Sequence, residues 1–263
     1  MTILEEIIAF KHHETAERRD LVPVKKLERS EHFTVPVVSL VSYLRRPDKV
    51  GIIAEIKRRS PSKGMLNEYI SVEQLSIGYM QAGASALSVL TDTKYFGGTN
   101  EDLTTARRFN YCPVLRKDFI VDEYQVIEAR AIGADAILLI AGALSAQQIK
   151  NFSALASSLG LEVVLEIHEY DELPPSLENI DILGMNNRNL QDFSTDVGRS
   201  FALAEKLPVD GITKISESGL SDPETILELK KAGFQGFLIG ETFMRNSRPE
   251  AVCAALVQKL QTG

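Results

Sequence analysis

The sequence predicts an α/β protein in which eight parallel strands close into a (β/α)8 (TIM) barrel. Short runs rich in β-branched residues alternate with helical patterns along most of the chain, which is typical of a parallel sheet covered by helices. Eight such runs favour a closed barrel over an open, doubly wound sheet. No linker rich in Gly, Ser or Pro interrupts the alternation. We therefore expect residues 1–263 to form one domain.

Residues 1–48 precede the alternating pattern and are expected to form an N-terminal helical extension. An apolar stripe predicts an amphipathic helix over 3–19. Residues 20–36 are polar and proline-containing, so they are expected to be irregular, and a second short helix is expected from about 38 to 45. Because neither helix alternates with a strand, we expect the extension to pack on the main body.

From residue 51 onward the strands and helices follow one another regularly. The expected strands are 51–57, 86–91, 112–117, 136–140, 162–166, 182–186, 212–217 and 236–240. The expected helices are 71–83, 101–109, 122–132, 145–159, 195–206, 222–233 and 248–261. Pro174 and Pro175 lie where another helix would be expected, so we predict a short or broken helix over 169–178.

The composition argues against several classes of function. A net charge of −7 argues against general nucleic-acid binding, although local positive charge can still bind a small anion. No apolar run approaches the roughly 20 residues that cross a bilayer, and no signal-peptide pattern opens the chain. Cys112 and Cys253 cannot form a disulfide framework, and no Cys/His cluster has metal-ligand spacing. We expect a cytoplasmic protein with no membrane association and no metal.

Charged residues occupy strand ends that should be apolar. Strands buried on both faces read as nearly continuous apolar runs, yet Glu55 and Lys57 end the first strand on the same face as Ile53. Lys117 ends the third strand and Glu166 the fifth. In a barrel these ends meet at the active-site mouth. The four residues could form a salt-bridge network that closes the barrel, or a site for acid–base chemistry near pH 7; four matched positions favour the second reading.

Two strand exits near the C-terminus suggest a phosphate site. Residues 213–220 form a β-branched run that ends in a Ser-Gly turn, and 236–240 form an apolar run that ends in Gly240. We expect Ser221 to cap the following helix, with Glu224 completing a capping box. Barrels often bind phosphate after strands 7 and 8, at exposed backbone N–H groups. Two ordinary glycine-containing strand exits remain the alternative.

Other segments allow a functional and a structural interpretation. The basic loop 58–64 could be a lid that brings positive charge to an anion, or a solvated loop. Phe96 and Phe119 follow two strands and could flank an aromatic ligand or belong to the core. His168 shares the face of Glu166 and could approach the mouth, although a structural role is the simpler expectation. The remaining histidines are expected to face solvent: His12, His13 and His32.

Seven stretches, in order and spacing, match one known family. They are residues 53–64 (IAEIKRRSPSKG), 95–98, 113–120, 165–167, 184–190, 216–219 and 238–241. With these stretches and its two N-terminal helices, the chain resembles the indole-3-glycerol-phosphate synthase family over nearly its whole length. The resemblance implies ring closure, decarboxylation and dehydration of 1-(2-carboxyphenylamino)-1-deoxyribulose 5-phosphate, which yields indole-3-glycerol phosphate in tryptophan biosynthesis.

The resemblance also implies a role for each charged group. Lys117 would be the general acid that protonates the substrate ketone during ring closure. Glu166 would act as acid or base in the later dehydration. Glu55 and Lys57 would share the proton transfers and the charge balance, with the division of labour left open.

Substrate-binding roles follow from the same resemblance. Asn186 and Arg188 would place the anthranilate part of the substrate. The phosphate would be held by Lys57, Ser60, Ser218, Gly219, Gly240 and Glu241. The aromatic pocket would be lined by Phe96, Phe119 and Leu138. The family's chemistry implies no cofactor.

Two other functions stay open at this point. Another phosphate-binding barrel of the same pathway, such as phosphoribosylanthranilate isomerase, would need a Cys/Asp acid–base pair, whereas the first strand here carries Glu55 and Lys57. A barrel that binds a phosphorylated ligand without turnover is the second alternative. We take a monomer as the default, and association with other tryptophan-pathway enzymes is left open.

Overall fold

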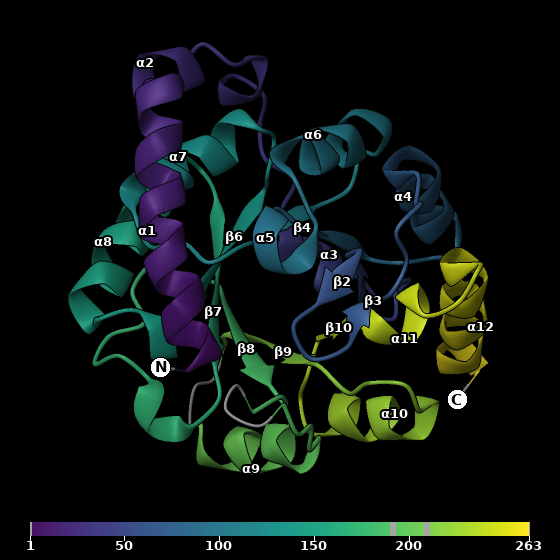
Figure 1. Cartoon of the computed structure of the whole chain (residues 1–263). Coiled ribbons are helices and arrows are strands. Elements are labelled where there is room, and N and C mark those ends of the chain that lie inside the picture. The colour runs from purple at the N-terminus through teal and green to yellow at the C-terminus, as the bar shows by residue number, and fades with distance from the viewer. Residues whose placement is uncertain (1, 190–192, 208–210, 263) are drawn as a thin grey trace.

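The computed structural model describes residues 2–189, 193–207 and 211–262. Within these residues, eight parallel strands form a closed barrel that helices surround, which confirms the predicted fold class (Figure 1). The barrel strands are β1 (Ile52–Ile56), β4 (Ala86–Leu90), β5 (Val114–Lys117), β6 (Ala136–Ile140), β7 (Glu162–Ile167), β8 (Ile182–Asn186), β9 (Thr213–Glu217) and β10 (Gly236–Ile239). Because β1 pairs with both β4 and β10, the sheet has no free edge.

The outer helices agree with the predicted pattern. They are α4 (Val72–Gln81), α6 (Asn100–Phe109), α7 (Glu123–Ala131), α8 (Ala146–Ser158), α9 (Gly198–Lys206), α10 (Pro223–Lys231) and α12 (Pro249–Thr262). Short helices that were not predicted follow three strands: α5 (Thr93–Phe96), η2 (Ala141–Ala143) and α11 (Glu241–Met244). After β7 the chain forms only the short helix η3 (Tyr170–Glu172), as the two prolines predicted. Nowhere in the described chain does a helix have the length and apolar character needed to cross a membrane.

The helix after β9 begins one residue later than predicted. Asp222, not Ser221, is the N-cap of α10, and its carboxylate accepts the backbone N–H of Thr225 at 2.9 Å. Pro223 occupies the first helical position, where its fixed φ suits the helix and its missing N–H is not needed. The predicted capping box between Ser221 and Glu224 is therefore wrong.

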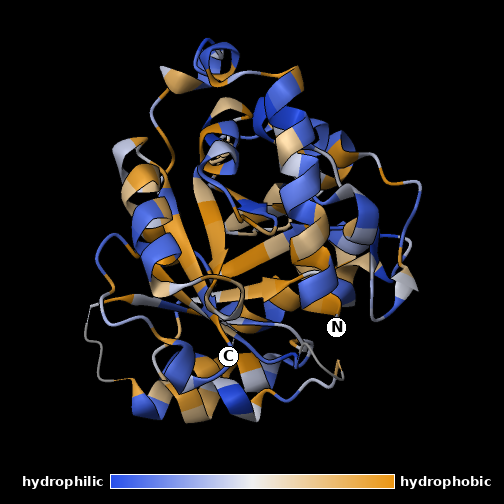
Figure 2. Ribbon diagram, turned by 60° about the vertical axis from the view of Figure 1, so that its left-hand side comes forward, coloured by the Kyte–Doolittle hydropathy of each residue, from blue (hydrophilic) through white to orange (hydrophobic). Residues whose placement is uncertain are grey.

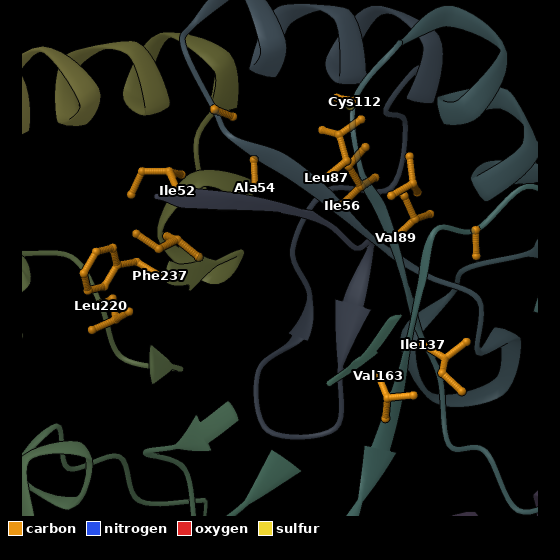
Figure 3. Close-up of a cluster of buried hydrophobic side chains, with 14 of the residues drawn as sticks. Ile52, Ala54, Ile56, Leu87, Val89, Cys112, Ile137, Val163, Leu220 and Phe237 are labelled. Atoms are coloured by element: carbon orange, nitrogen blue, oxygen red, sulfur yellow. The ribbon is translucent and has the colours of Figure 1, made fainter. Parts of the chain in front are cut away.

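Alternation along the strands divides the apolar core into two layers. On β1, Ile52, Ala54 and Ile56 point toward the outer helices and belong to the cluster drawn in Figure 3. Ile53 belongs to a second cluster inside the barrel. Figure 2 shows the consequence for the sequence, since the strands are mainly orange whereas the helices alternate between orange and blue. The inner apolar layer lies inside the barrel, below the charged residues at the carboxyl ends of the strands.

The N-terminal extension packs against the barrel. It consists of α1 (Ile3–Leu21), α2 (Val24–Leu27), η1 (Glu31–Phe33) and α3 (Leu40–Leu44). α2 and η1 lie in the segment that was expected to be irregular. Thr2 and Glu5 form a capping box that starts α1, which contacts α7 (Figure 1).

The end of the extension closes the amino-terminal end of the barrel. Leu40 and Leu44 of α3 belong to the apolar cluster inside the barrel. Asp135, just before β6, accepts the backbone N–H groups of Val38 at 2.7 Å and Val114 at 2.8 Å. Burial raises the pKa of Asp135 to about 6. This carboxylate thus ties the extension to the start of β5.

Candidate active site

The structure brings every predicted site residue to one pocket at the carboxyl ends of the strands. The pocket is lined by all of them: Glu55, Lys57, Ser60, Phe96, Lys117, Phe119, Leu138, Glu166, Asn186, Arg188, Ser218, Gly219, Gly240 and Glu241. One residue of the matched stretch 184–190, Leu190, lies outside the described residues. Strand ends that are far apart in the sequence meet here because the sheet closes on itself.

Lys117 lies at the centre of a buried charged cluster. Its Nζ lies 2.7 Å from Oε2 of Glu166 on β7 and 3.0 Å from Oε2 of Glu217 on β9. Nδ2 of Asn186 donates a hydrogen bond to the other oxygen of Glu166 at 2.9 Å. One ammonium group is therefore shared by two carboxylates, and the amide of Asn186 fixes the orientation of one of them.

The cluster shifts the three pKa values in different directions. Burial opposes the charge of Lys117, but the carboxylates of Glu166, Glu217 and Glu55 raise its pKa above the ordinary value. Burial favours a neutral Glu166, yet the charges of Lys117 and His168 lower the pKa of Glu166 below its usual range. Burial raises the pKa of Glu217, and Lys117 offsets this only in part. The site therefore holds an ammonium acid, an ionised carboxylate and a carboxyl group that keeps its proton more readily.

Glu217 is a site residue that the sequence analysis missed. Glu217 is the last residue of β9, and Glu166 lies near the end of β7. A charged residue at the end of a buried strand was the signal that identified Glu166, and the same signal is present at Glu217. Gly184 makes room for its side chain, because a Cβ atom at this position would lie 2.4 Å from Oε1 of Glu217. Any side chain on Gly184 would displace this carboxylate.

Glu55 and Lys57 form a second ion pair beside the central cluster. Both side chains point into the barrel mouth on the face of Ile53, as alternation along the strand predicted. Gly240 allows β10 to end against this pair, since a Cβ atom there would lie 2.2 Å from Oε1 of Glu55. Each carboxylate of the two clusters thus faces an ammonium group. Within the described residues, no group of three His, Cys, Asp or Glu side chains is placed to hold a metal ion.

Part of the pocket lining consists of the two turns at which the sequence analysis expected a phosphate. Ser218 and Gly219 both have left-handed backbone conformations, with φ of 69° and 74°, and a serine is uncommon there. Arg188 donates hydrogen bonds to Ser62 Oγ and, at 2.8 Å, to Oε2 of Glu241. This arginine therefore links the loop after β1 to the start of α11. In that loop, the short strands β2 (Arg59–Ser60) and β3 (Gly64–Met65) form a hairpin.

Another part of the pocket lining is apolar. The rings of Phe96 and Phe119 lie 5.9 Å apart, centroid to centroid, and Leu138 lies on the same lining. α1 completes this wall with three side chains of its apolar stripe: Ile3, Leu4 and Ile7. Their apolar stripe was the available signal, but nothing in the sequence indicated that it covers the mouth of the barrel.

Lys11 of α1 holds this wall in place. Its ammonium group, which is fully buried, lies 3.0 Å from Oδ2 of Asp92 and 2.9 Å from Oδ1 of Asp118. Asp92 accepts the backbone N–H of Phe96, and Asp118 accepts that of Phe119. The position of α1 is thereby tied to both aromatic rings.

Comparisons with known proteins agree with this geometry. The family model described as indole-3-glycerol phosphate synthase matches residues 4–256. An indole-3-glycerol phosphate synthase from Bacteroides thetaiotaomicron is 47% identical over 259 residues, covering 98% of this chain and 99% of the relative. One from Laribacter hongkongensis is 40% identical over 258 residues, covering 97% and 98%.

A more distant likeness concerns the fold alone. The structure of a mutant tryptophan synthase alpha-subunit from Pyrococcus furiosus superposes with a TM-score of 0.59 at 14% identity, covering 82% of this chain and 99% of that chain. The family is established by the sequence matches, which span nearly the whole chain with the charged cluster included. The chain belongs to the indole-3-glycerol phosphate synthase family.

Proposed function

We propose that this chain closes the pyrrole ring of 1-(2-carboxyphenylamino)-1-deoxyribulose 5-phosphate and releases carbon dioxide, water and indole-3-glycerol phosphate. The family consists of carboxy-lyases of tryptophan biosynthesis, which act on a phosphorylated small molecule. The single observation that carries the proposal is the position of Lys117. Its ammonium group lies between two buried carboxylates, in a pocket whose lining includes an apolar wall and the turns at Ser218–Gly219 and Gly240–Glu241.

These two parts of the pocket lining suit the two ends of this substrate. The anthranilate ring fits against Phe96, Phe119 and Leu138, where its faces meet apolar and aromatic carbon. The phosphate fits the turns at Ser218–Gly219 and Gly240–Glu241, with Ser60 and Lys57 beside it. Asn186 and Arg188 are left to orient the anthranilate carboxylate between the two ends.

Ring closure needs an acid at the ketone. Attack of the aromatic ring carbon on the carbonyl develops negative charge on its oxygen, and a nearby ammonium group can neutralise and then protonate it. Lys117 is suited to this step because its neighbours keep it charged. The carboxylate then leaves as carbon dioxide, and its bonding electrons return to the ring system.

Dehydration needs a second acid and a base. Glu217 suits protonation of the leaving hydroxyl, because its raised pKa keeps a proton available near neutrality. Glu166 is held ionised and suits removal of the ring proton. Glu55 and Lys57 are placed to rebalance charge between these steps. All of these groups come from one chain, which supports a monomer as the active species; we further propose that it acts in the cytoplasm.

Fluorescence tests the reaction directly. The chain has no tryptophan, so indole emission that grows after mixing with the substrate reports product almost alone. We expect rapid growth of this signal, and its loss in Lys117→Met. Tight binding without emission would instead support a non-catalytic barrel. Conversion of phosphoribosylanthranilate in place of the proposed substrate would support the isomerase alternative.

A further inference from the structure

Turnover by the proposed reaction takes up one proton, and the inference below rests on that proposed function. The substrate carboxylate enters ionised and leaves as neutral carbon dioxide. The ketone oxygen and the leaving hydroxyl each receive one proton, and the ring carbon returns only one. Each cycle therefore draws one proton from solvent into a site that the bound substrate covers.

His168 lies directly behind the catalytic cluster. Its Nε2 is 3.6 Å from Oε1 of Glu166, and its Nδ1 is 3.5 Å from Oε2 of Glu172 in η3. The backbone N–H of His168 donates to the same oxygen of Glu172 at 2.7 Å, which holds that carboxylate beside the ring. Among the described residues, Nε2 of His168 has no hydrogen-bond partner although the side chain is buried.

These three residues form a line from the surface to the site. The side chains are 26% exposed at Glu172, 8% at His168 and 3% at Glu166. Of the three, only Glu166 is part of the substrate-pocket lining. A proton that follows this line reaches Glu166 without passing the bound substrate.

We propose that His168 is a positioning residue that delivers solvent protons to Glu166. The imidazolium donates its Nε2 proton to Oε1 of Glu166 and becomes neutral. Glu166 passes this proton, and the one that it took from the substrate, through Oε2 to Nζ of Lys117 at 2.7 Å. Lys117 keeps one of the two protons and returns the other to Glu217 at 3.0 Å. Rotation of the ring then turns the free nitrogen toward Glu172, where it takes up the next proton from solvent. In each cycle the imidazole loses one proton and gains one, so His168, Lys117 and the carboxylates of Glu166, Glu172 and Glu217 all return to their starting states.

The surrounding charges support this role. Burial opposes protonation of the imidazole, but the carboxylates of Glu172, Glu166 and Glu217 raise the pKa of His168 above its ordinary value. The ammonium group of Lys117 contacts the other oxygen of Glu166, Oε2, at 2.7 Å. Separations of this size are longer than a formed hydrogen bond, and catalytic hydrogen bonds in ligand-free enzymes are often long and shorten when substrate binds.

The variant His168→Gln tests the proposal. Glutamine keeps a polar group of similar length but cannot carry a proton. We expect kcat near pH 6.5 to fall about tenfold or more, with KM changed less than about twofold. Because the wild-type imidazole loses its charge at alkaline pH, the ratio of wild-type to variant kcat should shrink toward about pH 9. Added imidazole should restore part of the lost rate.

Two further variants separate this role from a structural one. Glu172→Gln should lower kcat in the same direction with an unchanged far-ultraviolet circular dichroism spectrum, because the surface carboxylate is lost. Glu169→Gln is the matched control, since Glu169 is exposed and pairs with Arg199 instead; its kcat should stay within about twofold of wild type.

The opposite outcomes are distinct. An unchanged kcat in both His168→Gln and Glu172→Gln would overturn the proposal, as would a loss of kcat that is constant with pH and not rescued by imidazole. Absence of turnover in the wild-type protein would instead mean that the proposed function has failed.

Discussion

Two consecutive residues of β5 carry positive charge to opposite faces of the sheet. Arg116 points outward and is fully buried among the helices. Its guanidinium donates to Oε2 of Glu128 at 2.6 Å, to the carbonyl of Gln125 at 2.8 Å and to Oδ2 of Asp118 at 3.1 Å. Lys117 points inward and meets Glu166 and Glu217.

The buried polar atoms around Arg116 and those around Lys117 differ in how many of them have a hydrogen-bond partner. Each guanidinium nitrogen of Arg116 donates to an acceptor, and these acceptors come from α6, α7 and the loops after β4 and β5. Around Lys117, the described residues leave Oε1 of Glu217 and Nε2 of His168 buried without a hydrogen-bond partner. Buried polar atoms are rarely left unpaired without a reason. The comparison suggests that the outer network stabilises the fold and that the inner cluster is built for a substrate.

Lys117→Met should produce the largest effect. Loss of the general acid should lower kcat by about 10²–10⁴-fold. The variant should still fold, because Glu166 and Glu217 can bind protons and so lose the negative charge that Lys117 balanced. Steady-state kinetics and circular dichroism check this together. Near-normal turnover in a folded variant would remove Lys117 from the acid role.

Arg116→Met should affect stability more than chemistry. Removing this cation leaves the carboxylates of Asp118 and Glu128 partly uncompensated, and breaking such a buried pair costs about 3–5 kcal/mol. Urea unfolding should report this loss. The kcat of the folded fraction, counted by active-site titration, should fall far less than in Lys117→Met. Equal losses of kcat in the two variants would contradict the division between the outer and inner networks.

Glu217→Gln should change how stability depends on pH. Because the pKa of Glu217 is raised in the folded state, the folded chain holds a proton that the unfolded chain releases above about pH 4.3. This contribution to stability is complete below the unfolded pKa and is lost as pH rises through the folded pKa. Wild-type Tm should therefore fall between about pH 5.5 and pH 8 by about 2–4 °C more than that of the variant. Parallel Tm curves would show that Glu217 is ionised throughout.

The outward and inward faces also differ in what the sequence could predict. Alternation along β1 placed Glu55 and Lys57 on the inward face with Ile53, and the position of Lys117 at the end of a strand placed it at the mouth. The same rule covered Glu217, which was overlooked. The partners of Lys11 could not be predicted, since Asp92 and Asp118 are far away in the sequence and only the closed barrel brings them under α1.

The predicted start of a helix was wrong by one residue where two neighbouring residues could both serve as the N-cap. Ser221 and Asp222 can both cap a helix, and the proline that follows Asp222 decides between them. The prediction of the fold rested on eight repeats of a strand followed by a helical segment, so an error at the end of one helix or strand did not change it. The contribution of α1 to the pocket depends on long-range contacts, such as those of Lys11 with Asp92 and Asp118, for which the sequence offers no periodic signal.

The attachment of α3 at the base of the barrel has a consequence for synthesis on the ribosome. Arg45, directly after α3, donates to Oγ1 of Thr213 at 3.0 Å, and 168 residues separate these two partners. At typical rates of translation, the ribosome adds Thr213 roughly 8–34 s after it adds Arg45. During that time the strands that will enclose Leu40 and Leu44 are incomplete, so these two leucines stay exposed in the nascent chain until the last strands emerge.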